Sequence, residues 1–440
     1  MMKRHHIALR WKNNMKQSTV LKNEIQENKY NTRLLELYLD EEKLKYQKER
    51  YIQAINKFES LYGAKDIEIY SAPGRSEIGG NHTDHQHGKV LAASINLDCI
   101  AIVSKRDDNK IKIVSDDFDI NPVDLSDLSM KEEEAGTSES LIRGVCQRFI
   151  ELGYSIGGFD AYMTSEVLVG AGLSSSAAFE VAIGTVLSGL YNDMKVDAVT
   201  IAKVGQYAEN YYFKKPCGLM DQMASSVGSI IYIDFKNIEE PHIERLDVDF
   251  SSFKHSLCIV DTKGSHADLT DDYASIPAEM KEVAHVFNKE YLCDIDEHEF
   301  YTNLNKVHEV CHDRALLRAI HLFEENKRVE KEVEALRSNN FEAFKKQVQL
   351  SGNSSFKYLQ NVYSNHDIHH QSIPLGLVLT EKFLEDHGVC RVHGGGFAGT
   401  IQAFVPDHLV KEYQTYIEDF FGKGTCHILK IRNDGGCKVI

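Results

Sequence analysis

A glycine- and serine-rich segment at residues 167–184 has the composition of an anion-binding turn. VLVGAGLSSSAAFEVAIG passes from an apolar run into a helix-forming run. Gly170 and Gly172 would let the backbone approach a ligand closely, and the serines supply hydroxyl and amide groups. Unpaired N–H groups and the helix dipole make such a helix N-terminus a phosphate site. The segment has neither a Walker GK[ST] ending nor a dinucleotide GxGxxG pattern, and the simpler alternative is a capped helix after a flexible turn.

Three other segments place polar residues among glycines. They are APGRSEIGGNHTDHQHG at 72–88, CGLMDQ at 217–222 and RVHGGGFAGTIQAFV at 391–405. Together with GAGLSSSAA they resemble, in order and spacing, the motifs of the GHMP kinases, which include galacto-, homoserine, mevalonate and phosphomevalonate kinases. The segment at 72–88 is similar to the sugar box of galactokinases, whose usual form is GRxNLIGEHTDYxxG. The resemblance covers roughly residues 66–440.

The resemblance implies an ATP-dependent kinase that phosphorylates the anomeric hydroxyl of galactose. Mg²⁺ prefers oxygen ligands and keeps several waters, so one hydroxyl and one carboxylate suffice to hold it. By the resemblance these are Ser176 and Glu209, although Glu209 alone would be interpreted as a solvated helix carboxylate. The residues expected to bind ATP are Ser115, Gly170, Ala171, Gly172, Leu173, Ser174, Ser175 and Ser176.

Phosphoryl transfer also needs a positioned nucleophile and a group that accepts its proton. Asp221 matches the aspartate that takes the anomeric proton in galactokinases, and Arg75 matches the family's catalytic arginine. A guanidinium beside Asp221 would keep that carboxylate ionised and would offset charge on the transferred group. We therefore expect Asp221 and Arg75 to be the catalytic pair.

The residues expected to bind the sugar by this resemblance are Asn81, His82, Thr83, Asp84, Gly218 and Tyr273. Asp84 is an acceptor for paired ring hydroxyls, a contact that distinguishes epimers. Asn81 replaces the glutamate that galactokinases present to the 6-hydroxyl. An amide can still bind that hydroxyl, but the lost negative charge no longer excludes a 6-carboxylate. Galacturonate, or another galacto-configured sugar, is therefore the alternative substrate.

Two other interpretations compete with a sugar kinase. His82, His85 and His87 could form a transition-metal cluster with Asp84, but three histidines so close in sequence cannot all turn to one ion without an unusual loop. A non-catalytic sensor of sugar and ATP would resemble the enzyme with a damaged serine-rich loop. The loop here is intact, which favours catalysis.

The elements that must position these residues form three parts. Residues 1–63 predict a helical extension, because Ile52, Ile55, Phe58 and Leu61 recur at helical spacing before a glycine stop at Gly63. The β-rich and helical runs that follow predict an α+β fold with a mainly antiparallel sheet. The resemblance implies two lobes at 64–245 and 246–440, ribosomal-protein-S5-like and ferredoxin-like. The site would lie in the cleft between them, with the third glycine motif closing over the phosphates.

The composition limits the remaining possibilities. At 440 residues the chain exceeds the ~250–300 residues of a single core. A net charge of −16 argues against nucleic acid and anionic membranes as partners. Nine cysteines without a CxxC pair are typical of reduced thiols. No apolar run approaches the ~18 residues of a membrane span, and no secretory signal is evident, so we expect a cytoplasmic protein.

Overall fold

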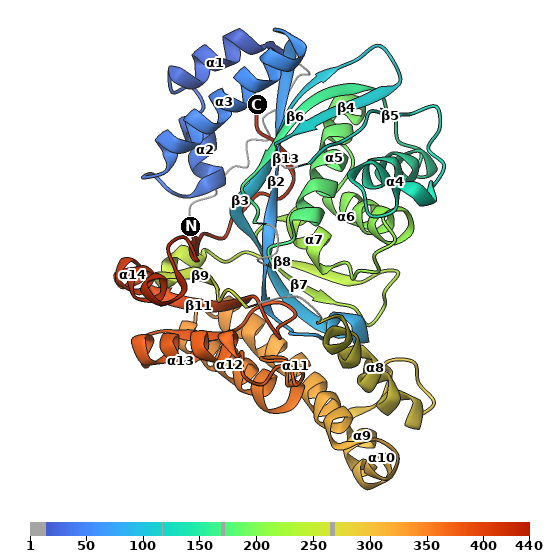
Figure 1. Ribbon diagram of the computed structural model, residues 1–440, viewed down its shortest axis with the longest axis vertical. Helices are drawn as coiled ribbons and strands as arrows, with labels where there is room; N and C mark the ends of the chain where they lie inside the picture. The colour runs from blue at the N-terminus through green and yellow to red at the C-terminus, as the bar shows by residue number, and fades with distance from the viewer. Residues whose placement is uncertain (1–14, 117, 169–171, 265–268) are drawn as a thin grey trace.

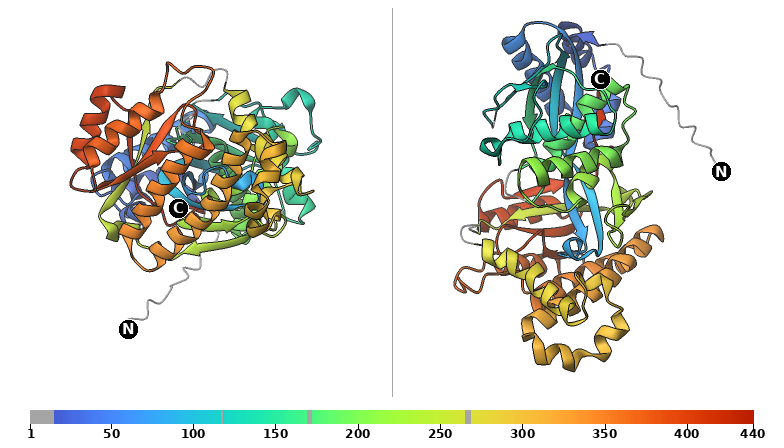
Figure 2. Two further views of the ribbon diagram at one scale, coloured as in Figure 1. Left: turned by 90° about the horizontal axis from the view of Figure 1, so that it is seen from below. Right: turned by 90° about the vertical axis from the view of Figure 1, so that its right-hand side faces the viewer.

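The computed structural model describes residues 15–440 except 117, 169–171 and 265–268. The molecule is elongated and has two α+β lobes, each built on its own sheet (Figure 1). The N-terminal helices and helices α9–α10 lie at opposite ends of the long axis, as a second view confirms (Figure 2). The prediction of a two-lobed α+β fold is confirmed.

Within the described residues, the first sheet has nine strands and is antiparallel except for the parallel pair β4–β6. Its order is β1-β2-β3-β6-β4-β5, with β7 and β8 continuing from β3 and β13 pairing with β2. The strands are β1 (Lys16–Gln17), β2 (Asp66–Gly79), β3 (Lys89–Lys105), β4 (Lys110–Ser115), β5 (Val123–Asp124), β6 (Phe159–Ser165), β7 (Ile230–Asp234), β8 (His242–Leu246) and β13 (Cys437–Lys438).

Helices cover both faces of the long strands β2 and β3, so these strands are buried along almost their whole length. In Figure 1 one group of helices lies on the right-hand side of the sheet, and the N-terminal group lies on the left. The right-hand helices are α4 (Ser138–Glu151), α5 (Ser175–Asn192), α6 (Ala198–Tyr207) and α7 (Met220–Val227); the left-hand ones are α1 (Ser18–Gln26), α2 (Asn31–Tyr38) and α3 (Leu44–Tyr62).

Helices α1, α2 and α3 lie within residues 18–62, and α3 stops at Gly63, whose φ of 79° suits glycine. Ile55 and Phe58 are fully buried against the left-hand face of the sheet. Leu61, however, is 40% exposed. The apolar stripe of the helix continues from Phe58 to Tyr62, four residues on, and so leaves Leu61 on the outer edge.

One buried carboxylate joins the extension to the other end of the chain. Asp98 on β3 is fully buried and accepts hydrogen bonds from Arg50 of α3 at 2.7 Å and from Arg432 at 3.0 Å. Burial alone would raise the pKa of Asp98, but the charges of the two arginines outweigh it and lower that pKa. Arg432 precedes β13, so residues from both ends of the chain complete the first lobe.

The second sheet has four antiparallel strands in the order β10-β11-β9-β12. Helix α11 also packs against β2 and β3, so it connects the two lobes. The boundary expected between residues 245 and 246 falls in the last two residues of β8. The elements of this part are β9 (His255–Asp261), β10 (Val389–Val392), β11 (Thr400–Pro406), β12 (Cys426–Leu429), α8 (Thr270–Val286), α9 (Glu297–Thr302), α10 (Leu304–Val310), α11 (Asp313–Arg337), α12 (Phe341–Ser354), α13 (Ser372–Leu384) and α14 (Val410–Phe421).

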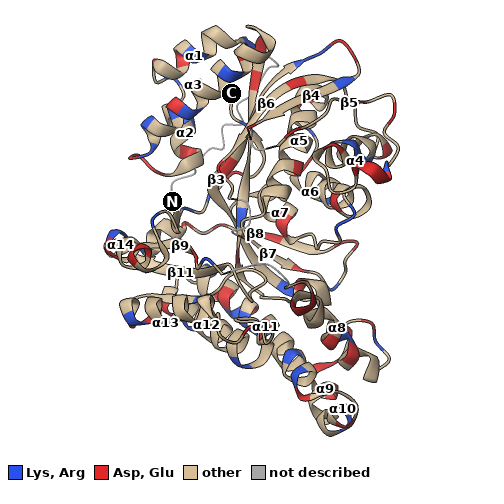
Figure 3. Ribbon diagram, viewed as in Figure 1, with Lys and Arg blue, Asp and Glu red and all other residues tan. Residues whose placement is uncertain are grey.

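Acidic and basic residues are interspersed along the helices of both lobes (Figure 3). None of the helices in the described part of the chain combines the length and the apolar composition that a bilayer crossing requires.

Candidate active site

Arg75 and Asp221, which lie far apart in the sequence, form a direct ion pair. Arg75 is on β2 and Asp221 is in the first turn of α7. Nε of Arg75 donates to Oδ1 of Asp221 at 2.7 Å, and Nη1 of Arg75 donates to the carbonyl of Gly172. Oγ of Ser174 donates to the other oxygen, Oδ2 of Asp221, at 2.5 Å. The serine-rich turn and the expected catalytic pair therefore form one constellation.

The charge of Asp221 is stabilised by these neighbours. Burial would raise the pKa of this carboxyl, but the Arg75 charge and the hydrogen bonds from Arg75 and Ser174 outweigh it and hold the pKa below its ordinary value. Asp221 is therefore an ionised acceptor at neutral pH. Its side chain is 33% exposed, so it is accessible to a bound molecule.

The serine-rich turn leads directly into α5, as the sequence predicts. Gly172 has φ 68° and Ser174, just before the helix, has φ 57°, so the chain turns sharply before its first helical residue. Ser175 and Ser176 begin the helix, where backbone N–H groups lack partners within it. Leu173 is buried, and its carbonyl accepts from the backbone N–H of Arg75 at 3.1 Å. Gly170 and Ala171 lie outside the described residues.

A pocket of about 460 Å³ adjoins this helix N-terminus. Ser115, at the end of β4, lines it together with Ser175 and Ser176. Aromatic and aliphatic side chains form other parts of the wall, and these include Phe118, Phe179, Phe213, Met163 and Val167. A pocket with apolar walls and an anion-binding end can hold a planar heteroaromatic ring that carries phosphates.

A hydroxyl and a carboxylate meet beside the first turn of α5. Oγ of Ser176 donates to Oε1 of Glu209 at 3.4 Å, and Glu209 lies in η3 (Ala208–Tyr212) with only 2% of its surface exposed. Nζ of Lys215 contacts the same oxygen at 3.0 Å, and Nε2 of Gln222 donates to Oε2 at 2.7 Å. This donor set of oxygen atoms suits Mg²⁺.

A second carboxylate, Asp84, lies close to the catalytic pair. It is in η1 (Asp84–Gln86), and a Cβ added at Gly218 would lie 2.7 Å from its Oδ2. Burial raises the pKa of Asp84 to about 6, and the negative charges of Glu77 and Asp221 act in the same direction. Asp84, Gly218 and Asp221 thus surround a site with two acceptor carboxylates, which suits a polyhydroxylated ligand.

The side chains of Asn81 and Thr83 bind protein groups and are fully buried. The Thr83 hydroxyl lies 2.9 Å from the carbonyl of Gly80 and 2.6 Å from that of Lys89, which closes the turn. Nδ2 of Asn81 donates to the carbonyl of Gly394 at 2.7 Å, and its Oδ1 accepts from Asn361 and Ser355. A contact between Asn81 and a 6-hydroxyl stays a prediction.

The third glycine motif covers this box. Burial lowers the pKa of His82, and its neutral ring donates from Nε2 to the carbonyl of Gly395 at 2.9 Å. The hydroxyl of Tyr273 donates to the carbonyl of Gly396 at 3.0 Å. Gly172 of the serine-rich turn faces His393, since a Cβ at Gly172 would lie 3.3 Å from that ring. The motif therefore contacts both the sugar box and the serine-rich turn.

Sequence reasoning missed three charged or polar side chains of this region. Glu77 accepts from Arg391 at 3.1 Å, and His393 lies 3.1 Å from the Ser76 hydroxyl. Glu77 and His393 both lie inside motifs quoted above, and this position was the signal by which the sequence could have identified them. Lys215 stands two residues before the CGLMDQ motif and carries no such signal, because a lysine in a loop is ordinarily a solvated side chain.

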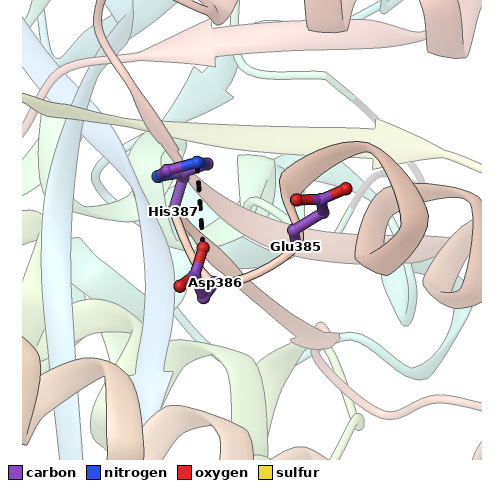
Figure 4. Close-up of side chains that lie close together, drawn as sticks. All are labelled: Glu385, Asp386 and His387. Atoms are coloured by element: carbon purple, nitrogen blue, oxygen red, sulfur yellow. Dashed lines mark ion pairs between the residues drawn. The ribbon is translucent and has the colours of Figure 1, made fainter.

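The histidines of the box do not converge on one point. The ring of His87 stacks on Tyr291 at 3.7 Å, while His82 turns to the third glycine motif. Within the described residues, the group close enough to share an ion is Glu385, Asp386 and His387. These side chains project from the turn after α13, and all three are exposed (Figure 4). They lie outside the constellation described above.

Two family models match the chain. One, described as "Galactokinase galactose-binding signature", matches residues 56–105, and another, "GHMP kinases N terminal domain", matches residues 140–229. The galactokinase of Actinobacillus pleuropneumoniae (serotype 5b, strain L20) is 32% identical over an alignment of 383 residues that covers 84% of this chain and 94% of the relative. The galactokinase of Streptomyces coelicolor is 29% identical over 370 residues, 83% of this chain and 91% of the relative.

Solved structures share the fold. Lactococcus lactis galactokinase, complexed with galactose, superposes with a TM-score of 0.72 and 24% identity, covering 87% of this chain and 98% of its own. Methanococcus jannaschii mevalonate kinase gives a TM-score of 0.60 and 16% identity, covering 83% and 99%.

Proposed function

This chain belongs to the galactokinase family, and on that premise we propose that it transfers the γ-phosphoryl group of ATP to the anomeric hydroxyl of galactose, giving galactose 1-phosphate and ADP. The observation that carries the proposal is the constellation of Arg75, Asp221 and Ser174 at the head of α5. It places an ionised acceptor beside a helix N-terminus that suits phosphate.

Asp221 is the group that accepts the proton of the sugar hydroxyl. A carboxylate is a weak base for an alcohol, but in phosphoryl transfer the nucleophile loses its proton late and its position matters more than its basicity. Arg75 fixes the orientation of Asp221 and supplies positive charge near the transferred group. Ser174 holds the second carboxylate oxygen, so the carboxylate cannot rotate freely.

The sugar lies against Asp84 and Gly218, where a backbone without a side chain leaves room beside the carboxylate. Asp84 accepts hydrogen bonds from ring hydroxyls. The remaining expected sugar-box residues, Asn81, His82 and Thr83, shape this pocket through the contacts described above, and Tyr273 supports it through the third glycine motif.

The nucleotide lies along α5, with its base in the 460 Å³ pocket near Ser115 and its phosphates at the N-terminus of α5, where Ser175 and Ser176 line that pocket. Ser176 and Glu209 would hold Mg²⁺, which offsets phosphate charge when bound. Buried cysteines such as Cys146, Cys258 and Cys390 are free thiols, which fits a reducing compartment, and we propose the cytoplasm.

The test is an ADP-release assay with galactose, talose, glucose, N-acetylgalactosamine, galacturonate and no sugar. Galactose-dependent ADP release, with galactose 1-phosphate identified by NMR, is the expected result. Nucleotide and sugar binding without ADP release would contradict the proposal and identify a sensor. A higher kcat/KM for another sugar would contradict the assignment of galactose.

The pH dependence of sugar use should report Asp84. Because its pKa is about 6, Asp84 loses its charge as the pH falls through 6 and then accepts hydrogen bonds less well. We expect kcat/KM for galactose to be about tenfold lower at pH 5 than at pH 7.5. A profile that is flat from pH 5 to 7 would remove Asp84 from this role.

The ionised carboxylate of Asp84 should also destabilise the folded protein. Its pKa rises from 3.8 to about 6 on folding, so its ionised form destabilises the native state above pH 6 and does so less at lower pH. Asp84→Asn should therefore raise Tm by about 1–3 °C at pH 8, with a smaller gain at pH 5, while sugar binding is lost. Calorimetry at both pH values checks this, and a lower Tm at pH 8 would contradict it.

Gly218→Ala should damage sugar use selectively. The new Cβ would lie 2.7 Å from Oδ2 of Asp84, so the carboxylate must move, although the backbone of Gly218 does not require glycine. We expect kcat/KM for galactose to fall about tenfold or more, since a small misplacement near the reacting groups has large effects. The KM for ATP should stay within about twofold. Equal losses for both substrates would indicate general disruption.

A further inference from the structure

We propose that Lys215 is a placeholder cation. Its ammonium group occupies the position on Glu209 that Mg²⁺ would take in the loaded enzyme, and it would leave that position when the metal binds with the nucleotide. This inference rests on the proposed function, because it concerns the same metal site.

Lys215 and the proposed metal would both contact the same oxygen of Glu209. Oε1 of Glu209 is the oxygen that lies 3.4 Å from the Ser176 hydroxyl, and Nζ of Lys215 contacts it at 3.0 Å. The other oxygen, Oε2, accepts from Nε2 of Gln222 at 2.7 Å and is thereby held in place. A metal that binds Ser176 and Glu209 together must therefore compete with Lys215 for Oε1.

The buried carboxylate of Glu209 needs a cation beside it, whether or not the metal is bound. The Glu209 side chain is only 3% exposed, and a buried carboxylate without an opposite charge is unstable. A second carboxyl, Glu180, shares Gln222 with it. Burial and the charge of Glu209 raise the pKa of Glu180 well above its ordinary value. Lys215 therefore balances the charge of Glu209 in the enzyme without metal.

Lys215 can leave without repacking the lobe. Lys215 lies between η3 and α7, and 62% of its side chain is exposed. Only the end of this flexible side chain contacts Glu209. The adjacent Lys214 is also exposed, but it lies 3.8 Å from Glu132 and makes no contact with Glu209. The chain thus supplies a matched control of the same residue type.

The experiment measures Mn²⁺ binding to the full-length protein without nucleotide, by electron paramagnetic resonance. Lys215→Met should bind Mn²⁺ about threefold to tenfold more tightly than the unmodified protein, since the competing ion pair is partly exposed. Lys214→Met should be unchanged, and Lys215→Arg, which keeps the charge, should stay close to the unmodified protein.

Several outcomes overturn the inference. They are an unchanged Mn²⁺ affinity in Lys215→Met, equal gains in Lys214→Met or in Lys215→Arg, and no Mn²⁺ binding by any variant. Galactose-dependent ADP release is measured on the same preparations. If that activity is present while Mn²⁺ affinity is unchanged, only the role of Lys215 fails; if the activity is absent from the unmodified protein, the proposed function fails instead.

Discussion

Asp221→Asn is expected to lower kcat by about a thousandfold, while the affinity for ATP changes by less than about threefold. Asparagine has nearly the shape of aspartate, and its amide oxygen can still accept from Nε of Arg75, so the fold and the serine-rich turn should persist. What is lost is the negative charge and the capacity to take a proton. Rapid-quench measurement of galactose 1-phosphate formation separates this chemical step from product release.

Ser174→Ala is the matched control for this variant. It removes the hydrogen bond to Oδ2 of Asp221 but leaves the carboxylate and its pairing with Arg75. A loss of about tenfold is expected, because orientation is relaxed and the acceptor remains. If Asp221→Asn were no worse than Ser174→Ala, positioning alone would explain the role of Asp221, and it would not be the proton acceptor.

Arg75→Met should have the second largest effect, with kcat/KM for galactose lowered by about a hundredfold to a thousandfold. Arg75 supplies the charge that offsets the burial of Asp221 and also donates to Gly172 of the serine-rich turn. Without it, burial raises the pKa of Asp221. The acidic limb that Asp221 contributes to the pH–rate profile therefore moves to higher pH.

The test depends on the direction in which the acidic limb of the pH–rate profile moves. With Arg75 present, the Asp221 pKa lies below its ordinary value of 3.8, so this group stays ionised throughout the usual assay range. Arg75→Lys keeps a positive charge and should show a smaller displacement of the limb, which protects the test if Arg75→Met folds poorly. A limb that stays in place in both variants would contradict the proposed electrostatic role.

The sequence was most informative where local rules decide the structure. The glycine stop at Gly63 and the helix that follows the serine-rich turn could both be predicted from spacing and turn residues. The pairing of Arg75 with Asp221 followed from the family resemblance, because nothing local links two residues 146 positions apart.

The contacts that the sequence did not predict depend on the docking of the two lobes. One such contact joins Nδ2 of Asn81 to the carbonyl of Gly394 from the second lobe. Whether a buried amide turns toward ligand or protein depends on which partner is nearer in the fold. Lys215 was overlooked for a different reason: it lies in the same lobe as Glu209, but a lysine in a loop is ordinarily a solvated side chain.

The joining of the two chain ends at Asp98 has a consequence for biosynthesis. A ribosome finishes residues 64–246 well before it reaches Arg432, so the nascent first lobe emerges with Asp98 lacking one of its two arginines and β2 lacking its partner β13. The first lobe is therefore completed only after Arg432 and β13 have been synthesised. An expression fragment cut after β8 should emerge as an aggregation-prone species, with an open sheet edge and a partly unbalanced buried charge.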